Sequence, residues 1–354
     1  MEKRVTTFEI ASAYIGVTIG AGFASGQEVL QYFSLFGPNS ILAIILSSIL
    51  FVFFGSVILD LGRRLGATSH LELLRYSGGK YLSVFTDGVT TFFLFGSFSA
   101  MAAGAGAVFA QQFNLPVLWG SAAMVAASAA TVVLGLRALV SVLSFVVPVL
   151  LVVVLGVVSA TLASNPVSLT QLLLVNRPWE AVVPYWPLSA LTYVSYNIVI
   201  AVAILAPLGA LAQKGRVIGE GALLGGIGLG LGILAINLAI IAVPGALGFP
   251  IPMASVAGRL SPFLGFLYSF ALLAAIYTTA VGALYGFAAR LAPAESARFR
   301  ITTLLAGTIA LAAAQLGFPS LVRYLYSAVG VAGILLLGGL TYTFARERYR
   351  GLIT

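Results

Sequence analysis

The 354-residue chain contains no cysteine, a single histidine and very little charge. The absence of cysteine excludes disulfides, thiol catalysis and thiolate metal sites. With His70 as the one imidazole, a histidine-based metal site is not expected. Only 8% of the residues are charged, whereas 60% are hydrophobic and the mean hydropathy is +1.08. A soluble domain of this size needs far more charge to cover its surface, so we predict a polytopic membrane protein.

Apolar runs of about 20 residues recur along the whole chain, and this length spans the roughly 30 Å of bilayer hydrocarbon. The runs are continuous rather than alternating, which favours an all-α protein over a membrane barrel. The basic start mimics a signal peptide, but the apolar pattern resumes beyond Gly26, so we interpret it as an uncleaved first span. Ten spans are predicted, at 8–36, 40–61, 83–112, 117–135, 138–163, 181–211, 217–243, 262–289, 301–317 and 319–344.

Basic residues are divided unequally between the two sides of this ten-span layout. One side carries fifteen, namely Lys3, Arg4, Arg63, Arg64, Arg75, Lys80, Arg137, Lys214, Arg216, Arg290, Arg298, Arg300, Arg346, Arg348 and Arg350. The other side carries three, Arg177, Arg259 and Arg323. The positive-inside rule makes the first side cytoplasmic, with both termini there, in the plasma membrane or a prokaryotic inner membrane. The net charge of +8 then reflects topology and contact with membrane lipid, and no nucleic-acid partner is expected.

The first and sixth spans are longer than a straight crossing needs, and each has an unusual centre. Gly20, Gly22 and Gly26 interrupt the first span, while a polar patch at 192–197 occupies the middle of the sixth. Interrupted helices at matching places in two halves indicate an inverted-repeat transporter. The predicted halves are residues 1–163 and 181–344, joined by an extracytoplasmic linker at 164–180 and followed by a cytoplasmic tail at 345–354. Close packing of small residues against another helix is the alternative explanation of the glycines.

Breaks in both spans would expose backbone groups around a polar cavity, because freed N–H and C=O groups are not tolerated in hydrocarbon. Helix ends at two breaks suit a zwitterion, so an amino acid or similar compound is the expected substrate, with small amines and neutral metabolites left open. The segment 244–262 could form a lid outside the membrane. The predicted substrate-binding residues are Gly20, Ala21, Gly22, Phe23, Ala24, Ser25, Gly26, Tyr193, Ser195, Tyr196 and Asn197.

The stretch TIGAGFASGQEVLQYF, at 18–33, resembles the signature of the YkvI-type membrane proteins. Its IGAGF is similar to the first-helix glycine motif of the amino acid–polyamine–organocation superfamily, and YVSYN at 193–197 is a weaker match. The resemblance implies the LeuT fold of the sodium-coupled leucine transporter, with two inverted five-helix repeats and substrate held between broken helices 1 and 6. It implies transport but no particular substrate.

The resemblance also implies one sodium site. Its ligands would be the backbone carbonyls of Gly16, Ile19 and Ala275 and the hydroxyls of Thr278 and Thr279, all oxygen donors suited to a hard cation. Threonines in membrane helices also commonly bond their own backbone. Phe23 replaces an asparagine of the family's other sodium site, which argues against a second ion. Some superfamily members instead use a lysine in helix 5 for proton coupling, and the fifth span, 138–163, contains none.

Glu28 is a carboxylate near the middle of the predicted membrane, where insertion of a charge costs roughly 2.5–3.5 kcal/mol. With Gln27 it is predicted to act in coupling or gating, as a proton acceptor, a gate element or a contact for a cationic substrate. A hydrogen-bonded structural carboxyl is the alternative.

Enzyme and channel functions are alternatives to transport. Ser25 and His70 are separated between a span and a loop, mid-span aspartate pairs are absent from the sequence, and polar residues cluster centrally rather than lining a continuous pore. We therefore predict a secondary active transporter and no enzyme. It would work by alternating access on a small-molecule substrate, with sodium as coupling ion and no other cofactor. The alternatives are a proton-coupled transporter of a small amine or neutral metabolite and, after it, a channel, and no oligomeric state is predicted.

Overall fold

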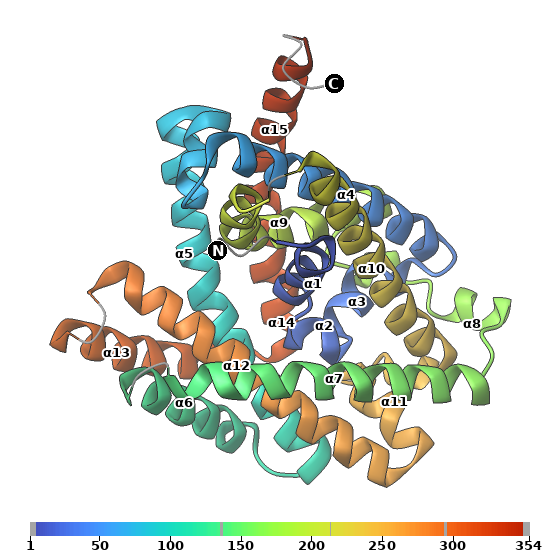
Figure 1. Cartoon of the computed structure of the whole chain (residues 1–354). Coiled ribbons are helices and arrows are strands. Elements are labelled where there is room, and N and C mark those ends of the chain that lie inside the picture. The colour runs from blue at the N-terminus through green and yellow to red at the C-terminus, as the bar shows by residue number, and fades with distance from the viewer. Residues whose placement is uncertain (1–4, 135–136, 213, 294–295, 350–354) are drawn as a thin grey trace.

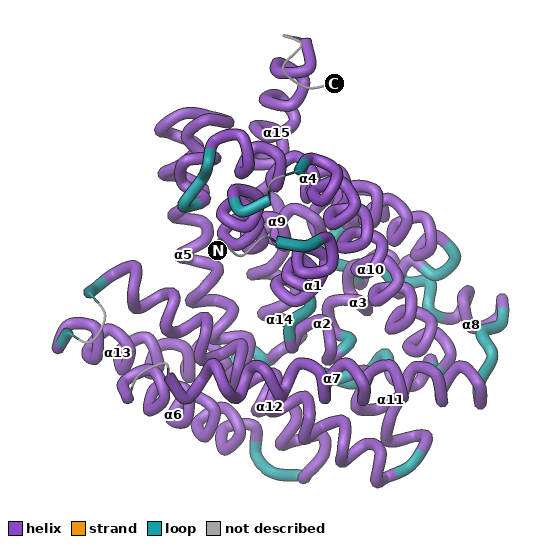
Figure 2. The backbone as a smooth tube through the Cα atoms, viewed as in Figure 1, coloured by secondary structure: helices purple, strands orange, loops and turns teal. Residues whose placement is uncertain are grey.

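The computed structural model describes residues 5–134, 137–212, 214–293 and 296–349, with the side chains of 137–148 outside the description. Within these ranges the chain is helical and contains no strand (Figures 1 and 2). The α-helices are α1 Thr7–Thr18, α2 Ala21–Ser25, α3 Gln27–Tyr32, α4 Asn39–Leu65, α5 His70–Phe113, α6 Val117–Leu134, α7 Arg137–Ser164, α8 Leu169–Leu174, α9 Trp186–Ala210, α10 Gly215–Ala242, α11 Pro252–Leu260, α12 Pro262–Leu291, α13 Ala297–Ala314, α14 Phe318–Leu321 and α15 Ser327–Tyr349. Short helical turns are η1 Ser34–Phe36, η2 Pro178–Glu180, η3 Pro244–Ala246 and η4 Val322–Tyr326.

In the described part of the chain, eight helices are long and apolar enough to cross a membrane. They are α4, α5, α6, α9, α10, α12, α13 and the continuous run Phe318–Tyr349. Of the other two predicted spans, the first is divided among α1 to α3, and the fifth coincides with α7, whose apolar part Val149–Ser164 is shorter. The all-helical membrane architecture is confirmed, whereas ten crossings and the inverted repeat stay predictions.

Helix α9 lies at the centre of one group of helices, where it packs against α4, α1 and α15 (Figure 1). Glycine allows α4 and α9 to touch through their backbones. A Cβ added at Gly62 would overlap the carbonyl of Ala206, and one at Gly209 would overlap that of Leu59. Helices α5, α6, α12 and α13 pack on one another as a second group, with α7 against α12.

The predicted break in the sixth span is wrong, because α9 runs uninterrupted through the polar patch. Its sequence offers no glycine between Trp186 and Leu208. The polar side chains instead bond the helix itself: the Thr192 hydroxyl donates to the Leu188 carbonyl at 2.6 Å, and the Asn197 amide donates to the Tyr193 carbonyl at 2.8 Å. Side chains rather than freed backbone groups therefore make the middle of α9 polar.

The remaining predicted segments have regular structure of their own. The linker 164–180 contains α8 and η2, and α15 continues as a helix through residues 345–349 of the predicted tail. Residues 350–354, the basic residues Lys3, Arg4 and Arg350, and the side chain of Arg137 lie outside the described part of the chain.

Candidate functional site

The first span is interrupted where the glycines predict it. Helix α1 ends at Thr18, and Ile19 and Gly20 are extended, with φ/ψ of −80°/97° and −108°/−173°. The five-residue helix α2 follows and ends at Gly26, whose φ of +80° is a left-handed conformation that favours glycine. The Ser25 hydroxyl stabilises this second junction, because it donates to the Gly22 carbonyl at 2.6 Å and accepts from the Gln27 amide at 3.1 Å.

Glu28 folds back from α3 onto α2. A Cβ added at Gly22 would overlap the Glu28 carboxylate, so the missing side chain provides the space that this carboxylate occupies. Glu28 is only 5% exposed, and its Oε2 accepts a hydrogen bond of 2.5 Å from the hydroxyl of Tyr196 in α9. This hydrogen bond joins the broken first span directly to the middle of α9.

Aromatic rings surround this pair, and we call Tyr32, Tyr193, Tyr196 and Tyr326 the tyrosine cluster. The Tyr196 ring lies 5.4 Å from that of Tyr193, 5.8 Å from Tyr32 and 5.3 Å from Tyr326, between ring centroids. Phe93 of α5 stacks on Tyr196 at 6.0 Å. All four tyrosines are buried, and the hydroxyls of Tyr32 and Tyr193 have no hydrogen-bond partner among the described residues.

The predicted substrate-binding residues are only partly brought together. Tyr193 and Tyr196 face the broken span, whereas the Ser195 hydroxyl lies against Gly333 of α15 and Asn197 bonds its own helix. Phe23 points toward Gly232 of α10. The Ala24 carbonyl accepts a hydrogen bond of 2.5 Å from the Tyr268 hydroxyl of α12.

Four residues of the site were not predicted from the sequence: Tyr32, Phe93, Tyr268 and Tyr326. Tyr32 was within reach of sequence reasoning, because it follows Glu28 by four residues and therefore shares its helix face. The others come from α5, α12 and the start of the last span, and no local pattern connects them to Glu28.

The candidate sodium ligands come from the first span and from α12. Ile19 is at the first break, and Ala275 and Thr278 are buried in α12, with Thr279 partly exposed beside them and Gly16 exposed on α1. The Thr278 hydroxyl donates to the Ala275 carbonyl at 2.9 Å, which leaves the hydroxyl lone pairs able to ligate a cation. The described residues contain no group of three or more His, Asp or Glu side chains that could hold a metal.

The segment predicted as a lid covers the second junction. A Cβ added at Gly26 would lie 2.7 Å from Cγ of Met253 in α11, so the two backbones approach closely. The Gln111 side chain holds Ile251, the residue before α11: its amide nitrogen donates to the Ile251 carbonyl at 3.0 Å, and its oxygen accepts from the Ile251 amide at 3.1 Å. The Gln31 amide donates to the Pro319 carbonyl at 3.0 Å. These contacts tie α11 and Pro319 to the broken first span and to α5.

Comparison with known proteins identifies the family. The chain is 27% identical over 355 residues to the membrane protein YkvI of Bacillus subtilis (strain 168), covering 98% of this chain and 99% of YkvI. It is 30% identical over 331 residues to YyaD of the same strain, covering 91% of this chain and 92% of YyaD. The chain belongs to the family of YkvI and YyaD. No protein-family model matches it.

Solved structures of low sequence identity share the fold of this YkvI relative. MhsT in complex with L-phenylalanine matches with a TM-score of 0.60 at 18% identity, over 94% of this chain and 88% of MhsT. Mhp1 in an inward-facing conformation matches with a TM-score of 0.59 at 15% identity, over 98% of this chain and 77% of Mhp1. A manganese transporter of Eremococcus coleocola matches with a TM-score of 0.55 at 14% identity, over 94% of this chain and 77% of the transporter. The chain thus shares the fold of these proteins, the LeuT fold that the resemblance of its first-span motif implies.

Proposed function

We propose that this protein is a secondary active transporter that encloses a small solute between its broken first span and α9, and that works by alternating access. One observation carries the proposal: a buried carboxylate, Glu28, lies at the helix break and meets the tyrosine cluster. A carboxylate at membrane depth normally faces a cavity and a partner. Five carboxylates take part in the ion pairs of the described residues, namely Asp60, Asp87, Glu180, Glu220 and Glu347, and Glu28 is not among them. Glu28 is thus available to a cation that enters the site.

An ammonium group on the solute fits these surroundings. It would bind Glu28 by a charge-assisted hydrogen bond, and the faces of Tyr193 and Tyr196 would add cation–π attraction. Amino acids and amines both carry this group. Because α9 is unbroken, one of the two helix ends that favoured a zwitterion is missing. Amines therefore join amino acids as the proposed substrates.

A thermal-shift screen followed by flux tests this function. Purified protein is screened against amines, amino acids and neutral analogues. A solute that binds the folded state increases the free energy of unfolding by RT ln(1 + [L]/Kd) and so raises the unfolding temperature. A stabilising solute should then accumulate in proteoliposomes against its gradient and show counterflow. Passive flux without counterflow would indicate a channel and contradict the proposal.

Sodium is the proposed coupling ion, bound by Ile19, Gly16 and the α12 oxygens of Ala275, Thr278 and Thr279. We expect sodium, but not potassium, to raise the unfolding temperature of the parent protein. The Thr278→Val/Thr279→Val double variant should lose this stabilisation, because both hydroxyl ligands are removed while side-chain volume is nearly kept. Thr308→Val is the matched control, since Thr308 is exposed on α13 and bonds only the Leu304 carbonyl. Equal sodium stabilisation in the double variant would refute this site.

Proton coupling is the second candidate, because Glu28 can itself exchange a proton within the site. Uptake driven by an inward proton gradient in sodium-free proteoliposomes, and lost in Glu28→Gln, would support it. Uptake that requires sodium at every pH would exclude it.

A further inference from the structure

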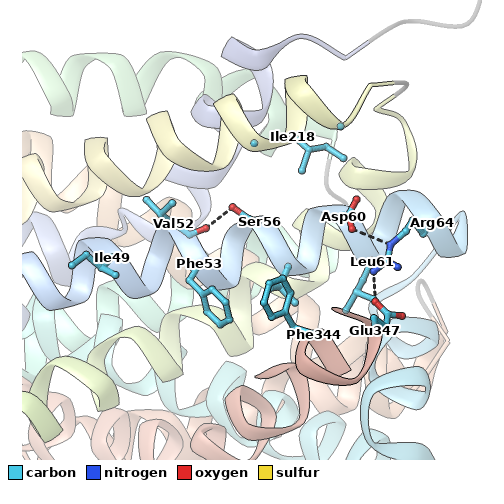
Figure 3. Close-up of a pocket in the computed structure, with 13 residues that line it drawn as sticks. Ile49, Val52, Phe53, Ser56, Asp60, Leu61, Arg64, Ile218, Phe344 and Glu347 are labelled. Carbon is cyan, nitrogen blue, oxygen red and sulfur yellow. Dashed lines mark hydrogen bonds and ion pairs between the residues drawn. The ribbon is translucent and has the colours of Figure 1, made fainter. Parts of the chain in front are cut away.

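A groove of about 480 Å³ lies between α4, α10 and α15 (Figure 3). Ile218 of α10 and Phe344 of α15 form two of its walls. Its longest wall is one face of α4, with residues recurring every three or four positions. This wall comprises Ile49, Val52, Phe53, Ser56, Val57, Asp60, Leu61 and Arg64. We call this feature the α4 groove.

The α4 groove is apolar over most of its length. Its one hydroxyl wall residue, Ser56, donates to the Val52 carbonyl at 2.7 Å and so has no free proton to offer a ligand. Phe53 packs edge-on against Phe344, with ring centroids 5.3 Å apart. Ile49, at the inner end, remains 59% exposed, so the groove is open along its side. An occupant must therefore be apolar where it meets α4.

One end of the groove is charged. Arg64 pairs with Asp60 at 2.9 Å and with Glu347 of α15 (Figure 3). Arg63 also pairs with Asp60, at 2.9 Å. Lys214 is exposed beside Gly215, which also lines the groove. The side chains lining or adjoining this end include three bases, Arg63, Arg64 and Lys214, and two acids, Asp60 and Glu347.

The depth of the groove matches one leaflet of a bilayer. Ile49 and Asp60 are eleven residues apart on a continuous helix, or about 17 Å at 1.5 Å per residue. Half of the roughly 30 Å hydrocarbon core is about 15 Å. When the charged end lies at the membrane surface, the apolar part reaches the bilayer midplane.

We propose that the α4 groove binds an anionic phospholipid, with one acyl chain along α4 and its phosphate beside Arg63 and Lys214. The positive-inside rule assigns this end to the cytoplasmic leaflet, where anionic lipids attract basic side chains. The bound chain touches α4, α10 and α15 together, so it stabilises the arrangement in which Arg64 and Glu347 are joined. This site is separate from the solute site around Glu28.

Filling the groove from within tests the proposal. A Cβ added at Gly219 of α10 meets nothing within 4 Å, so Gly219→Phe should occupy the groove without strain. The probe is dioleoyl phosphatidylglycerol added to detergent-purified protein, with phosphatidylcholine of the same chains for comparison. We expect phosphatidylglycerol to raise the unfolding temperature of the parent more than phosphatidylcholine, and native mass spectrometry to retain one bound molecule. Both effects should be lost in Gly219→Phe.

Gly282→Phe on α12 is the matched control, because its added Cβ also meets nothing within 4 Å. It should keep both effects. Lys214→Gln leaves the walls intact and should weaken phosphatidylglycerol binding about fivefold, without changing phosphatidylcholine binding. If Gly219→Phe does not fold, Gly215→Leu replaces it, since its added Cβ meets only Arg63, at 4.0 Å. Equal stabilisation by the two lipids, or unchanged phosphatidylglycerol binding in the filled variant, would overturn the proposal.

Discussion

Binding of an ammonium-bearing solute is expected to fall about 10- to 150-fold in the Glu28→Gln variant, with uptake falling at least as much. The range follows from a hydrogen bond to a charged group, which contributes about 1.5–3 kcal/mol. Glutamine has nearly the same shape and can still accept the hydrogen bond from Tyr196, so the variant removes the charge and keeps the packing. The loss should be measured as the Kd in a thermal-shift titration and as initial uptake in proteoliposomes.

Two further variants separate charge from structure. Glu180→Gln alters a carboxylate whose side chain is 60% exposed and pairs with Arg177, and it should leave binding unchanged. Tyr196→Phe keeps the charge and removes the 2.5 Å hydrogen bond, so it should retain selectivity for cationic over neutral analogues. If Glu28→Gln binds the amine as tightly as the parent, Glu28 is a structural carboxyl and the ammonium site is wrong.

The break in the first span could be predicted because its cause is local. Glycines at 20, 22 and 26 are poor helix formers, and the positive φ of Gly26 shows why that position favours glycine. The apolar spans and the polar character of 192–197 likewise follow from short stretches of sequence. The LeuT fold was implied by the resemblance of the first-span motif to a known superfamily, and the solved structures confirm the fold.

The site itself could be predicted only in part, because its contacts join distant segments. Glu28 and Tyr196 are 168 positions apart, and nothing in either segment shows that they share a hydrogen bond. The break predicted in α9 from symmetry with the first span was wrong. A polar centre was interpreted as a broken backbone, whereas side chains alone supply the polarity. A polar patch without glycine in a membrane helix is therefore weak support for unwinding.

Gly22→Ala is expected to reduce uptake more than tenfold, although it adds one methyl group. That methyl would overlap the Glu28 carboxylate, which must then leave its bond with Tyr196 or push α2 away from α3. Overpacking of this kind costs about 1–3 kcal/mol, so a lower unfolding temperature should accompany the loss. Both quantities are measurable on the same preparation, by thermal unfolding and by initial uptake.

Gly20→Ala is the matched control, two positions away in the same break. Gly20 has a φ of −108°, which alanine adopts readily, and a Cβ there meets nothing within 4 Å. It should change stability by no more than about 0.5 kcal/mol and leave uptake close to the parent. Equal losses in both variants would mean that the break needs glycine for flexibility throughout. Loss confined to Gly22→Ala would mean that the break exists to hold a carboxylate against α2, since space for Glu28 is what distinguishes the two positions.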